Sequence, residues 1–142
     1  MLQVLFDTNV VLDVLLKRQP WVVEAQKLWA AVDDGRVIGY LSATSVANIF
    51  YIARKAKGIE AAFEAVGICL ETFEICVVDR DVLRAAFSRE QGGTSDFEDN
   101  IQIACGSQVR VSSIVTRDTS GFNASAICSV SPAELLQQLS AL

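Results

Sequence analysis

The stretch Leu2-Gln3-Val4-Leu5-Phe6-Asp7-Thr8-Asn9 joins a short apolar run to a carboxylate, a hydroxyl and an amide. An apolar run of this length is typical of a buried strand in a parallel sheet, whose two faces are both covered. Ligands of such sheets bind outside the carboxyl ends of the strands. The stretch therefore predicts a buried strand that delivers Asp7 to a ligand crevice, although Asp7 also fits the N-cap of a following helix.

Further runs of this kind recur along the chain and alternate with helical stripes. We expect strands at 37–41, 75–78 and 111–115, and a short one at 127–130. Helices are expected between them, with apolar positions spaced as in Trp21, Ala25 and Leu28, and a closing helix from Pro132. No tight hairpin signal joins the first four strands, so crossover connections are required. The prediction is a three-layer α/β/α sandwich with a central, mainly parallel, four- or five-stranded sheet, formed by a single domain over 1–142.

The composition restricts the chemistry. The chain has 142 residues, of which 51% are hydrophobic, and it has no histidine. Serine- or cysteine-based catalysis with an imidazole base and histidine-ligated zinc are therefore excluded. Twelve Lys and Arg against 17 Asp and Glu give a net charge of −5. This balance argues against nucleic-acid binding by bulk positive charge, but it does not exclude a nuclease whose acids hold a metal ion.

The cysteines and the uncharged segments indicate a cytoplasmic protein. Cys69, Cys76, Cys105 and Cys128 show no CxxC spacing and lie in apolar stretches, so we expect buried free thiols in a reducing compartment. The first residues lack the basic region of a signal peptide. The longest uncharged run, 37–53, contains several polar residues and is interpreted as a strand and a helix, with no membrane association.

Further carboxylates stand at positions that the fold would bring near Asp7. Asp118 follows the strand at 111–115, and Asp96 and Asp99 open a helix with a spacing of three residues. Gathered like charges raise one another's pKa and destabilise the fold unless a cation neutralises them. Mg²⁺ and Mn²⁺ take oxygen ligands and leave positions open for a phosphate and an attacking water. The pattern predicts a hard-cation site for phosphodiester hydrolysis.

The individual acids also have structural interpretations. The spacing Ser95-x-x-Glu98 fits a capping box, which favours a structural role for Glu98. Asp118 precedes Thr119-Ser120-Gly121, and it is equally consistent with a turn. The conjunction of the acids is more informative than any one of them.

Four segments resemble the PIN-domain family, metal-dependent ribonucleases that include toxins of bacterial toxin–antitoxin pairs. They are Leu5-Phe6-Asp7-Thr8-Asn9, Ser42-Ala43-Thr44-Ser45-Val46-Ala47-Asn48, Asp96-Phe97-Glu98-Asp99 and Val115-Thr116-Arg117-Asp118. Each motif is weak alone, but the four stand in the family's order and at similar spacing over nearly the whole chain. The resemblance implies that Asp7, Asp99 and Asp118 are the catalytic metal-site acids, with Asp96 as a further ligand of Mg²⁺ or Mn²⁺.

The resemblance also assigns supporting residues and reveals one departure. Asn9 beside Asp7 and Thr116 beside Asp118 would hold a carboxylate or a water in place. Asn48 stands where the family usually has glutamate, so the site loses one negative charge. Either Asp96 compensates for that loss, or the site is weakened or inactive.

The function implied is that of a Mg²⁺- or Mn²⁺-dependent endoribonuclease acting on single-stranded RNA, as the toxin of a toxin–antitoxin pair. Arg54, Lys55, Lys57 and Arg117 are candidate RNA contacts, although the first three also fit a solvated helix end. The segment 91–94, with Gly92 and Gly93, is interpreted either as a loop at the cleft mouth or as a plain linker.

Two alternatives remain open at the level of sequence. Asn48 is compatible with a degenerate module that binds RNA or a protein without cleavage. A receiver-type phosphoacceptor domain also gathers acids at strand ends, but here no lysine follows the late strands. The partners expected are RNA, an antitoxin protein and a second copy of the chain. Trp21, Trp29 and Phe63 are candidates for the homodimer or antitoxin surface, unless they belong to the core.

Overall fold

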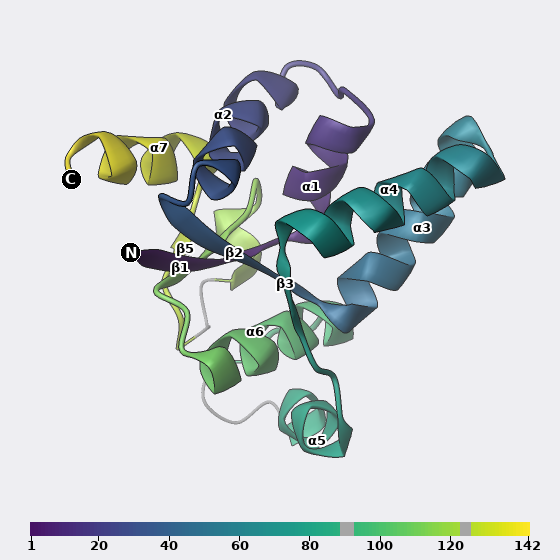
Figure 1. The fold of residues 1–142 in the computed structure, drawn as a ribbon. Helices are drawn as coiled ribbons and strands as arrows, with labels where there is room; N and C mark the ends of the chain where they lie inside the picture. The colour runs from purple at the N-terminus through teal and green to yellow at the C-terminus, as the bar shows by residue number, and fades with distance from the viewer. Residues whose placement is uncertain (89–92, 123–125) are drawn as a thin grey trace.

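A computed structural model describes residues 1–88, 93–122 and 126–142 of the chain. Each of the first three strands is followed by two helices (Figure 1). The strands are β1 (Leu2–Phe6), β2 (Val37–Ser42), β3 (Glu74–Cys76), β4 (Ser113–Val115) and β5 (Ser129–Val130). The helices are α1 (Thr8–Leu15), α2 (Val22–Asp33), α3 (Ala43–Lys57), α4 (Ile59–Thr72), α5 (Arg80–Ser88), α6 (Phe97–Val109) and α7 (Pro132–Ser140), with a 3₁₀ turn η1 (Thr119–Phe122).

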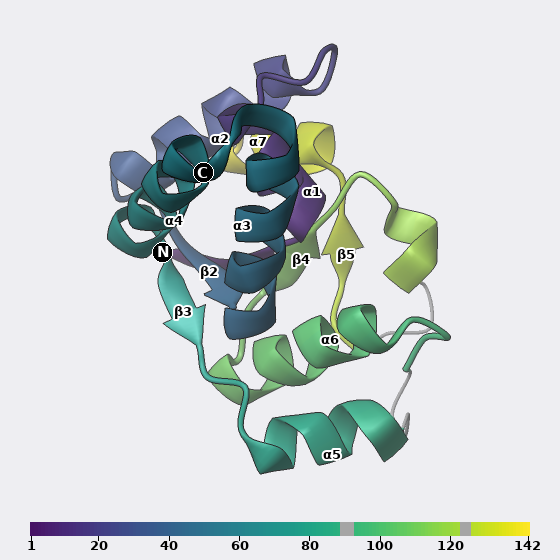
Figure 2. The same ribbon diagram turned by 90° about the vertical axis from the view of Figure 1, so that its right-hand side faces the viewer.

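All five strands pair in parallel, in the order β3-β2-β1-β4-β5. The first strand is central: Val4 lies opposite Gly39 of β2 on one side and Ser113 of β4 on the other. Helices cover both faces of the sheet, which Figure 2 shows with α5 and α6 on one side and the other helices opposite. The predicted α/β/α sandwich is confirmed, and the sheet has the larger of the two expected strand numbers.

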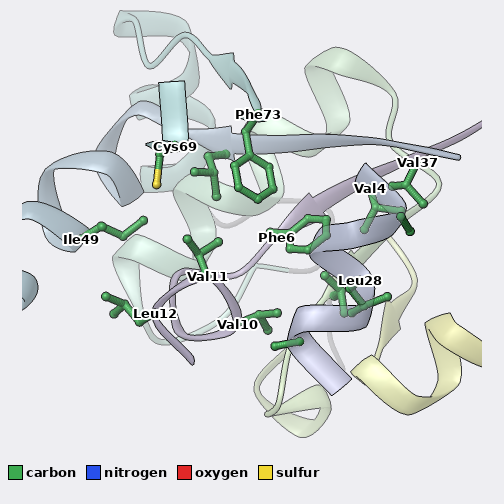
Figure 3. Packing of buried hydrophobic residues seen from close by; sticks show 14 of the residues in the cluster. Val4, Phe6, Val10, Val11, Leu12, Leu28, Val37, Ile49, Cys69 and Phe73 are labelled. Atoms are coloured by element: carbon green, nitrogen blue, oxygen red, sulfur yellow. The ribbon is translucent and has the colours of Figure 1, made fainter. Parts of the chain in front are cut away.

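Alternating side chains of β1 divide the apolar residues into two cores. Val4 and Phe6 point into the larger core, which includes Leu12 of α1 and Leu28 of α2 (Figure 3). Leu5 points to the opposite face, into a core formed with α5 and α6. Because β1 is covered on both faces, none of its residues is charged, and the first charged residue is Asp7, which follows it. The carboxyl end of β1 is thereby fixed deep in the fold.

Helix ends account for the differences from the predicted strand boundaries. Arg110 adopts the left-handed conformation with φ 60°, and the Val111 amide donates to the Gly106 carbonyl at 3.0 Å. Val111 therefore closes α6, and β4 begins at Ser113 instead of residue 111. At the other end of the fold, Ser131 and Glu134 form a capping box with Pro132 at the first helical turn. This arrangement confirms the predicted start of the closing helix.

The thiols agree with the sequence interpretation at three of four positions. Cys69, Cys76 and Cys105 are buried and free. Cys128 is free but exposed, so the prediction of a buried thiol is wrong there. The reason is that Cys128 lies in the connection just before the short edge strand β5, outside both cores. None of the helices in the described ranges is long and apolar enough to span a membrane.

Two glycines provide a matched test of the packing. A Cβ at Gly39 would lie 2.7 Å from Phe73 Cδ1, whereas a Cβ at Gly67 in α4 would meet no atom within 4 Å. The Phe73 ring is buried and packs edge-on against both Phe6 and Trp29, so it has no room to move. We expect Gly39→Ala to lower the free energy of unfolding by about 1–3 kcal/mol. Gly67→Ala should raise it by roughly 0.5–1 kcal/mol. Urea unfolding of both variants measures these changes, and equal effects would contradict the packing described.

Candidate functional site

Asp7 follows β1 directly and turns its side chain away from the helix that it precedes. Its backbone occupies the N-cap position of α1, but its carboxylate makes no capping hydrogen bond. Gln102 Nε2 donates to Asp7 Oδ1 at 3.2 Å, and Thr116 Oγ1 donates to Asp7 Oδ2 at 2.8 Å. Each oxygen of Asp7 is thus oriented by one neutral donor from another element. Such contacts fix the direction in which the carboxylate points.

Asp118 ends the segment that leaves β4 and stands at the start of η1. Its Oδ1 accepts hydrogen bonds from Ser120 Oγ at 2.7 Å and from the Gly121 amide at 3.1 Å. A Cβ on Gly121 would lie 2.8 Å from Asp118 Oδ2, so a larger residue there would displace this carboxylate. The turn interpretation of Asp118 is therefore correct, and the same residue also lines the cleft described below.

The start of α6 brings further acids to the same region. Asp96 is the N-cap residue, and its Oδ1 accepts from the Asp99 amide at 3.0 Å. The expected capping box of Ser95 and Glu98 is wrong, because the helix begins at Phe97 and the cap falls one residue later than predicted. Glu98 therefore does not cap the helix. Its Oε1 accepts a hydrogen bond from the hydroxyl of Thr8 at 3.4 Å.

These segments enclose a cleft of about 470 Å³ at the carboxyl ends of the strands. The cleft contains all four acids predicted from the sequence, together with Asn9 and Asn48, while Thr116 lies behind Asp7. Sequence reasoning missed Gln102, which donates to Asp7 from behind the cleft, and it gave Glu98 a different role. The lining residues are Asp7, Thr8, Asn9, Asn48, Ile52, Asp96, Glu98, Asp99, Asp118 and Phe122.

Asp99 experiences the crowding of charge most strongly. Its pKa is raised from 3.8 to about 7, first by burial and then by the nearby negative charges of Asp96, Asp7, Glu98 and Asp118. Without a bound cation, Asp99 is therefore partly protonated at neutral pH. A cation in the cleft would remove this repulsion and favour the ionised form.

The donors of the cleft suit a hard divalent cation, since the charged groups that line it are all carboxylates. In the arrangement described, however, no three acidic or thiol side chains among residues 1–88, 93–122 and 126–142 are close enough to hold one metal ion. Asp96 and Asp118 each direct one oxygen to a backbone amide. Simultaneous coordination by all the acids requires these side chains to turn toward a common point.

Asn48 enters the cleft from α3, whose start is held by hydroxyl groups. Ser42 caps α3 by accepting from the Ser45 amide at 3.1 Å, and Thr8 donates to Ser45 Oγ at 2.9 Å. This chain of contacts joins the first turn of α3 to the first turn of α1. Asn48 and Ile52, four residues apart, then face the cleft from α3. The uncharged amide of Asn48, which stands in place of the expected glutamate, therefore lies among the acids of the cleft.

The candidate RNA contacts are dispersed. Lys55 lies seven residues after Asn48, and therefore on the same face of α3 about two turns further along. Lys57 lines a different groove, with Leu15 and Leu16 of the α1 end. Arg54 lies on α3 outside the cleft lining. The first residues of the 91–94 segment lie outside the described part of the chain.

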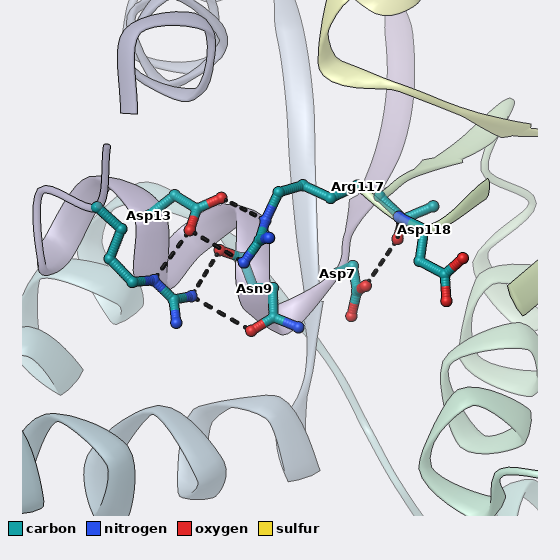
Figure 4. Close-up of polar contacts among 7 residues, drawn as sticks. Asp7, Asn9, Asp13, Arg117 and Asp118 are labelled. Atoms are coloured by element: carbon teal, nitrogen blue, oxygen red, sulfur yellow. Dashed lines mark hydrogen bonds and ion pairs between the residues drawn. The ribbon is translucent and has the colours of Figure 1, made fainter. Parts of the chain in front are cut away.

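Arg117 is held within the fold, although its neighbour Asp118 lines the cleft (Figure 4). Its Nε lies 2.8 Å from Asp13 Oδ2, and its guanidinium carbon stands 4.0 Å above the centre of the Trp21 ring. Asp13 also accepts from Arg18 Nε at 2.9 Å. Arg117 stacks on Trp21, which stays 44% exposed, and Phe63 is also exposed, whereas Trp29 packs on Phe73.

Residues 3–120 of the chain match the family described as PIN domain. A comparison with curated proteins gave no match. Among solved structures, a toxin–antitoxin complex from Klebsiella pneumoniae is similar with a TM-score of 0.68 and 22% identity, over 91% of this chain and 97% of that one. VapC20 of Mycobacterium tuberculosis, described as a Sarcin-Ricin loop cleaving toxin, is similar with a TM-score of 0.65 and 17% identity, over 78% of this chain and 86% of that one. VapBC2 from Rickettsia felis, bound to a DNA fragment from its promoter, is similar with a TM-score of 0.64 and 14% identity, over 92% of this chain and 98% of that one. These likenesses show a shared fold.

The raised pKa of Asp99 predicts a pH-dependent stability. Between the unfolded value of 3.8 and the folded value of about 7, the folded state holds a proton that the unfolded chain has lost. The ion-free protein should therefore lose stability as the pH rises through this window. Asp99→Asn removes the charge, and at pH 8 it should be more stable than the parent by about 1 kcal/mol after allowance for solvent screening. This corresponds to roughly 4 °C in Tm.

Thermal unfolding in EDTA at pH 8 and at pH 5 measures this effect. The difference between Asp99→Asn and the parent should shrink at pH 5, where the parent's carboxyl is protonated. Glu64→Gln, an exposed change on α4 outside the cleft, is the matched control. A Tm difference that is the same at both pH values would contradict the crowding of charge around Asp99.

Proposed function

The chain belongs to the PIN-domain family, and from this membership and its acidic cleft we propose a divalent-metal-dependent endoribonuclease that hydrolyses single-stranded RNA. The observation that carries the proposal is the convergence of acids from three separate segments: the end of β1, the exit of β4 and the start of α6. A family match of this extent also removes the receiver-type phosphoacceptor alternative. A similar structure is described as a toxin that cleaves the Sarcin-Ricin loop, which supports a nuclease.

Asp7, Asp96, Asp99 and Asp118 are the proposed ligands of Mg²⁺ or Mn²⁺. When bound, the ion would supply a water nucleophile of lowered pKa and stabilise charge on the leaving oxygen. Asp7 is already oriented for such a role by Gln102 and Thr116. Asp99 must release its proton before it can act as a ligand, so cation binding should become stronger as the pH rises through 7.

The RNA strand would meet the cleft along α3. Lys55 shares the face of α3 that carries Asn48 and Ile52, and we propose it as the first phosphate contact beyond the acids. Arg54 and Lys57 would contribute more general attraction for the phosphate backbone at the same helix end. Arg117 has a different role, because Asp13 and Trp21 already hold its guanidinium.

A second candidate function is a PIN module that binds RNA or protein without cutting. Two observations favour it. Asn48 places an uncharged amide in the cleft, and no three acidic side chains in the described ranges are close enough to share an ion. An amide oxygen can ligate a cation, but it contributes no charge to neutralise it. The two candidates therefore differ in the affinity that they require for a divalent ion.

The proposed partners are an antitoxin protein and a second copy of the chain. Similar structures include toxin–antitoxin complexes. On this chain, the rings of Phe50, Tyr51 and Phe63 lie together on α3 and α4, with Tyr51 64% and Phe63 63% exposed. Exposed aromatic rings gathered in this way are typical of interaction surfaces. We call this cluster the aromatic α3–α4 face and propose it as the surface that a partner covers.

The nuclease proposal predicts cleavage of a single-stranded RNA by the purified protein in Mn²⁺ or Mg²⁺. Excess EDTA should stop the cleavage. Asp7→Asn should reduce the rate by about 100-fold, because it removes a charge from the cleft while keeping the size of the side chain. Asp34→Asn, at an exposed position in an ion pair with Arg36, should cleave at the parent rate. Gel analysis of a labelled oligonucleotide measures all of these rates.

Calorimetric titration with Mn²⁺ separates the two candidate functions. The nuclease requires binding that Asp7→Asn weakens. Absence of Mn²⁺ binding at millimolar concentration, together with retained RNA binding, would establish the non-cleaving module instead. Cleavage that persists in EDTA would contradict the metal-dependent chemistry.

The partner proposal predicts a dimer at micromolar concentration that depends on the aromatic α3–α4 face. Phe63→Glu should give a monomer, because it buries a charge at the contact. Light scattering after size-exclusion chromatography measures the mass. Phe87→Glu, an equally apolar and exposed position on α5, is the control. A parent protein that is monomeric would exclude the homodimer and leave the antitoxin as the proposed partner.

A further inference from the structure

Asp13 is a buried carboxylate that neither the cleft nor the proposed chemistry uses. It lies on α1, and its side chain is 1% exposed. Burial raises its pKa, and the opposite charges of Arg117 and Arg18 act against that rise. Taking a carboxylate out of water costs several kcal/mol, and a buried ion pair generally contributes no more stability than well-packed apolar side chains would. The presence of Asp13 therefore calls for a reason other than stability.

The contacts of Asp13 lead to two sides of the cleft (Figure 4). On one side, Arg18 pairs with Asp13, and its Nη2 donates to the backbone oxygen and to Oδ1 of Asn9, each at 3.2 Å. Asn9 is a lining residue of the cleft. Asp13 is therefore one side chain away from the α1 wall of the site.

On the other side, Asp13 holds Arg117, the residue immediately before Asp118. Arg117 Nε lies 2.8 Å from Asp13 Oδ2, and its Nη2 donates to Asp13 Oδ1 at 3.4 Å. The planar guanidinium is also confined by the Trp21 ring, 4.0 Å from its carbon. A fork held by two carboxylate oxygens and an aromatic face has little freedom to move. The backbone that leads from β4 to Asp118 is fixed accordingly.

We propose that Asp13 is a positioning residue that sets the separation between Asn9 on α1 and Asp118 at the exit of β4. Oδ1 contacts both Arg18 and Arg117, and Oδ2 lies beside Arg117, so a single side chain links the two walls of the cleft. The link acts on the segment that carries Asp118, which is exposed and bonded only to its own turn and to Thr116 in the contacts described. The consequence for cation binding rests on the proposed function, whereas the local ordering does not.

The test compares hydrogen exchange of individual amides in the parent and in Asp13→Asn. We expect the amides of Asp118 and Gly121 to exchange about 10-fold faster, relative to the change in the central strand β1, because their segment loses its tether. A change by one common factor at all amides would overturn the proposal, since it would show a loss of global stability only. Asp34→Asn breaks an exposed ion pair and should leave all amides unchanged.

Arg117→Lys provides a second variant that keeps the positive charge beside Asp13 but loses the fork. It should fold even where Asp13→Asn does not, and it should accelerate exchange at Asp118 in the same direction by a smaller factor. Unchanged exchange at Asp118 in this variant would overturn the proposal if Asp13→Asn does not fold.

Mn²⁺ affinity, measured by calorimetry well below the unfolding temperature, tests the connection to the cleft. We expect Asp13→Asn to weaken binding about 10-fold, as other changes one step removed from metal ligands do. If the parent binds Mn²⁺ and Asp13→Asn binds it with the same affinity, this connection is overturned. A parent that binds no Mn²⁺ contradicts the proposed function instead, and the exchange experiment still decides whether Asp13 positions Asp118.

Discussion

Electrostatic repulsion among carboxylates at one edge of a parallel sheet is the constraint on which the rest of the site depends. Parallel pairing of β1 with β4 forces Asp7 and the segment of Asp118 to the same edge. The start of α6 adds Asp99, whose raised pKa reports the resulting crowding. Hydrogen bonds to the carboxylates offset part of this repulsion: neutral side chains donate to Asp7, and backbone amides donate to Asp96 and Asp118. The cleft between these acids has room for a cation.

The elements that the sequence predicts well are those set by local chemistry. The apolar run 2–6 is the observed β1. Ala25 and Leu28 of the predicted stripe are buried on α2, which begins after Trp21 and ends just before Gly35, whose φ of 78° suits glycine. The acids were also placed correctly at one edge, because strand direction follows from the need for crossover connections. Periodicity and topology together were sufficient for this level of description.

The features that escaped prediction depend on contacts between distant segments. Gln102 lies on a helix 95 residues from Asp7, and nothing in its local pattern distinguishes it from a surface glutamine. Asp13 has a helical neighbourhood of apolar residues, and its partner Arg117 is 104 residues away. Arg117 is a candidate RNA contact by its position beside Asp118, but its guanidinium is paired with Asp13 and stacked on Trp21. The predicted N-cap, Ser95, is one residue too early, because the helix begins at Phe97 and Asp96 is its N-cap.

The thiols of this fold differ sharply in accessibility. Cys69, Cys76 and Cys105 are buried, and burial raises the pKa of Cys69 to about 12, so this thiol is a poor nucleophile at neutral pH. Cys128 alone among the four is exposed. It precedes β5, which pairs with β4 and so stands next to the strand that leads to Asp118. A maleimide or methanethiosulfonate reagent would therefore place one spectroscopic reporter on the native chain, without mutation, from which distances to a paramagnetic ion in the cleft can be measured.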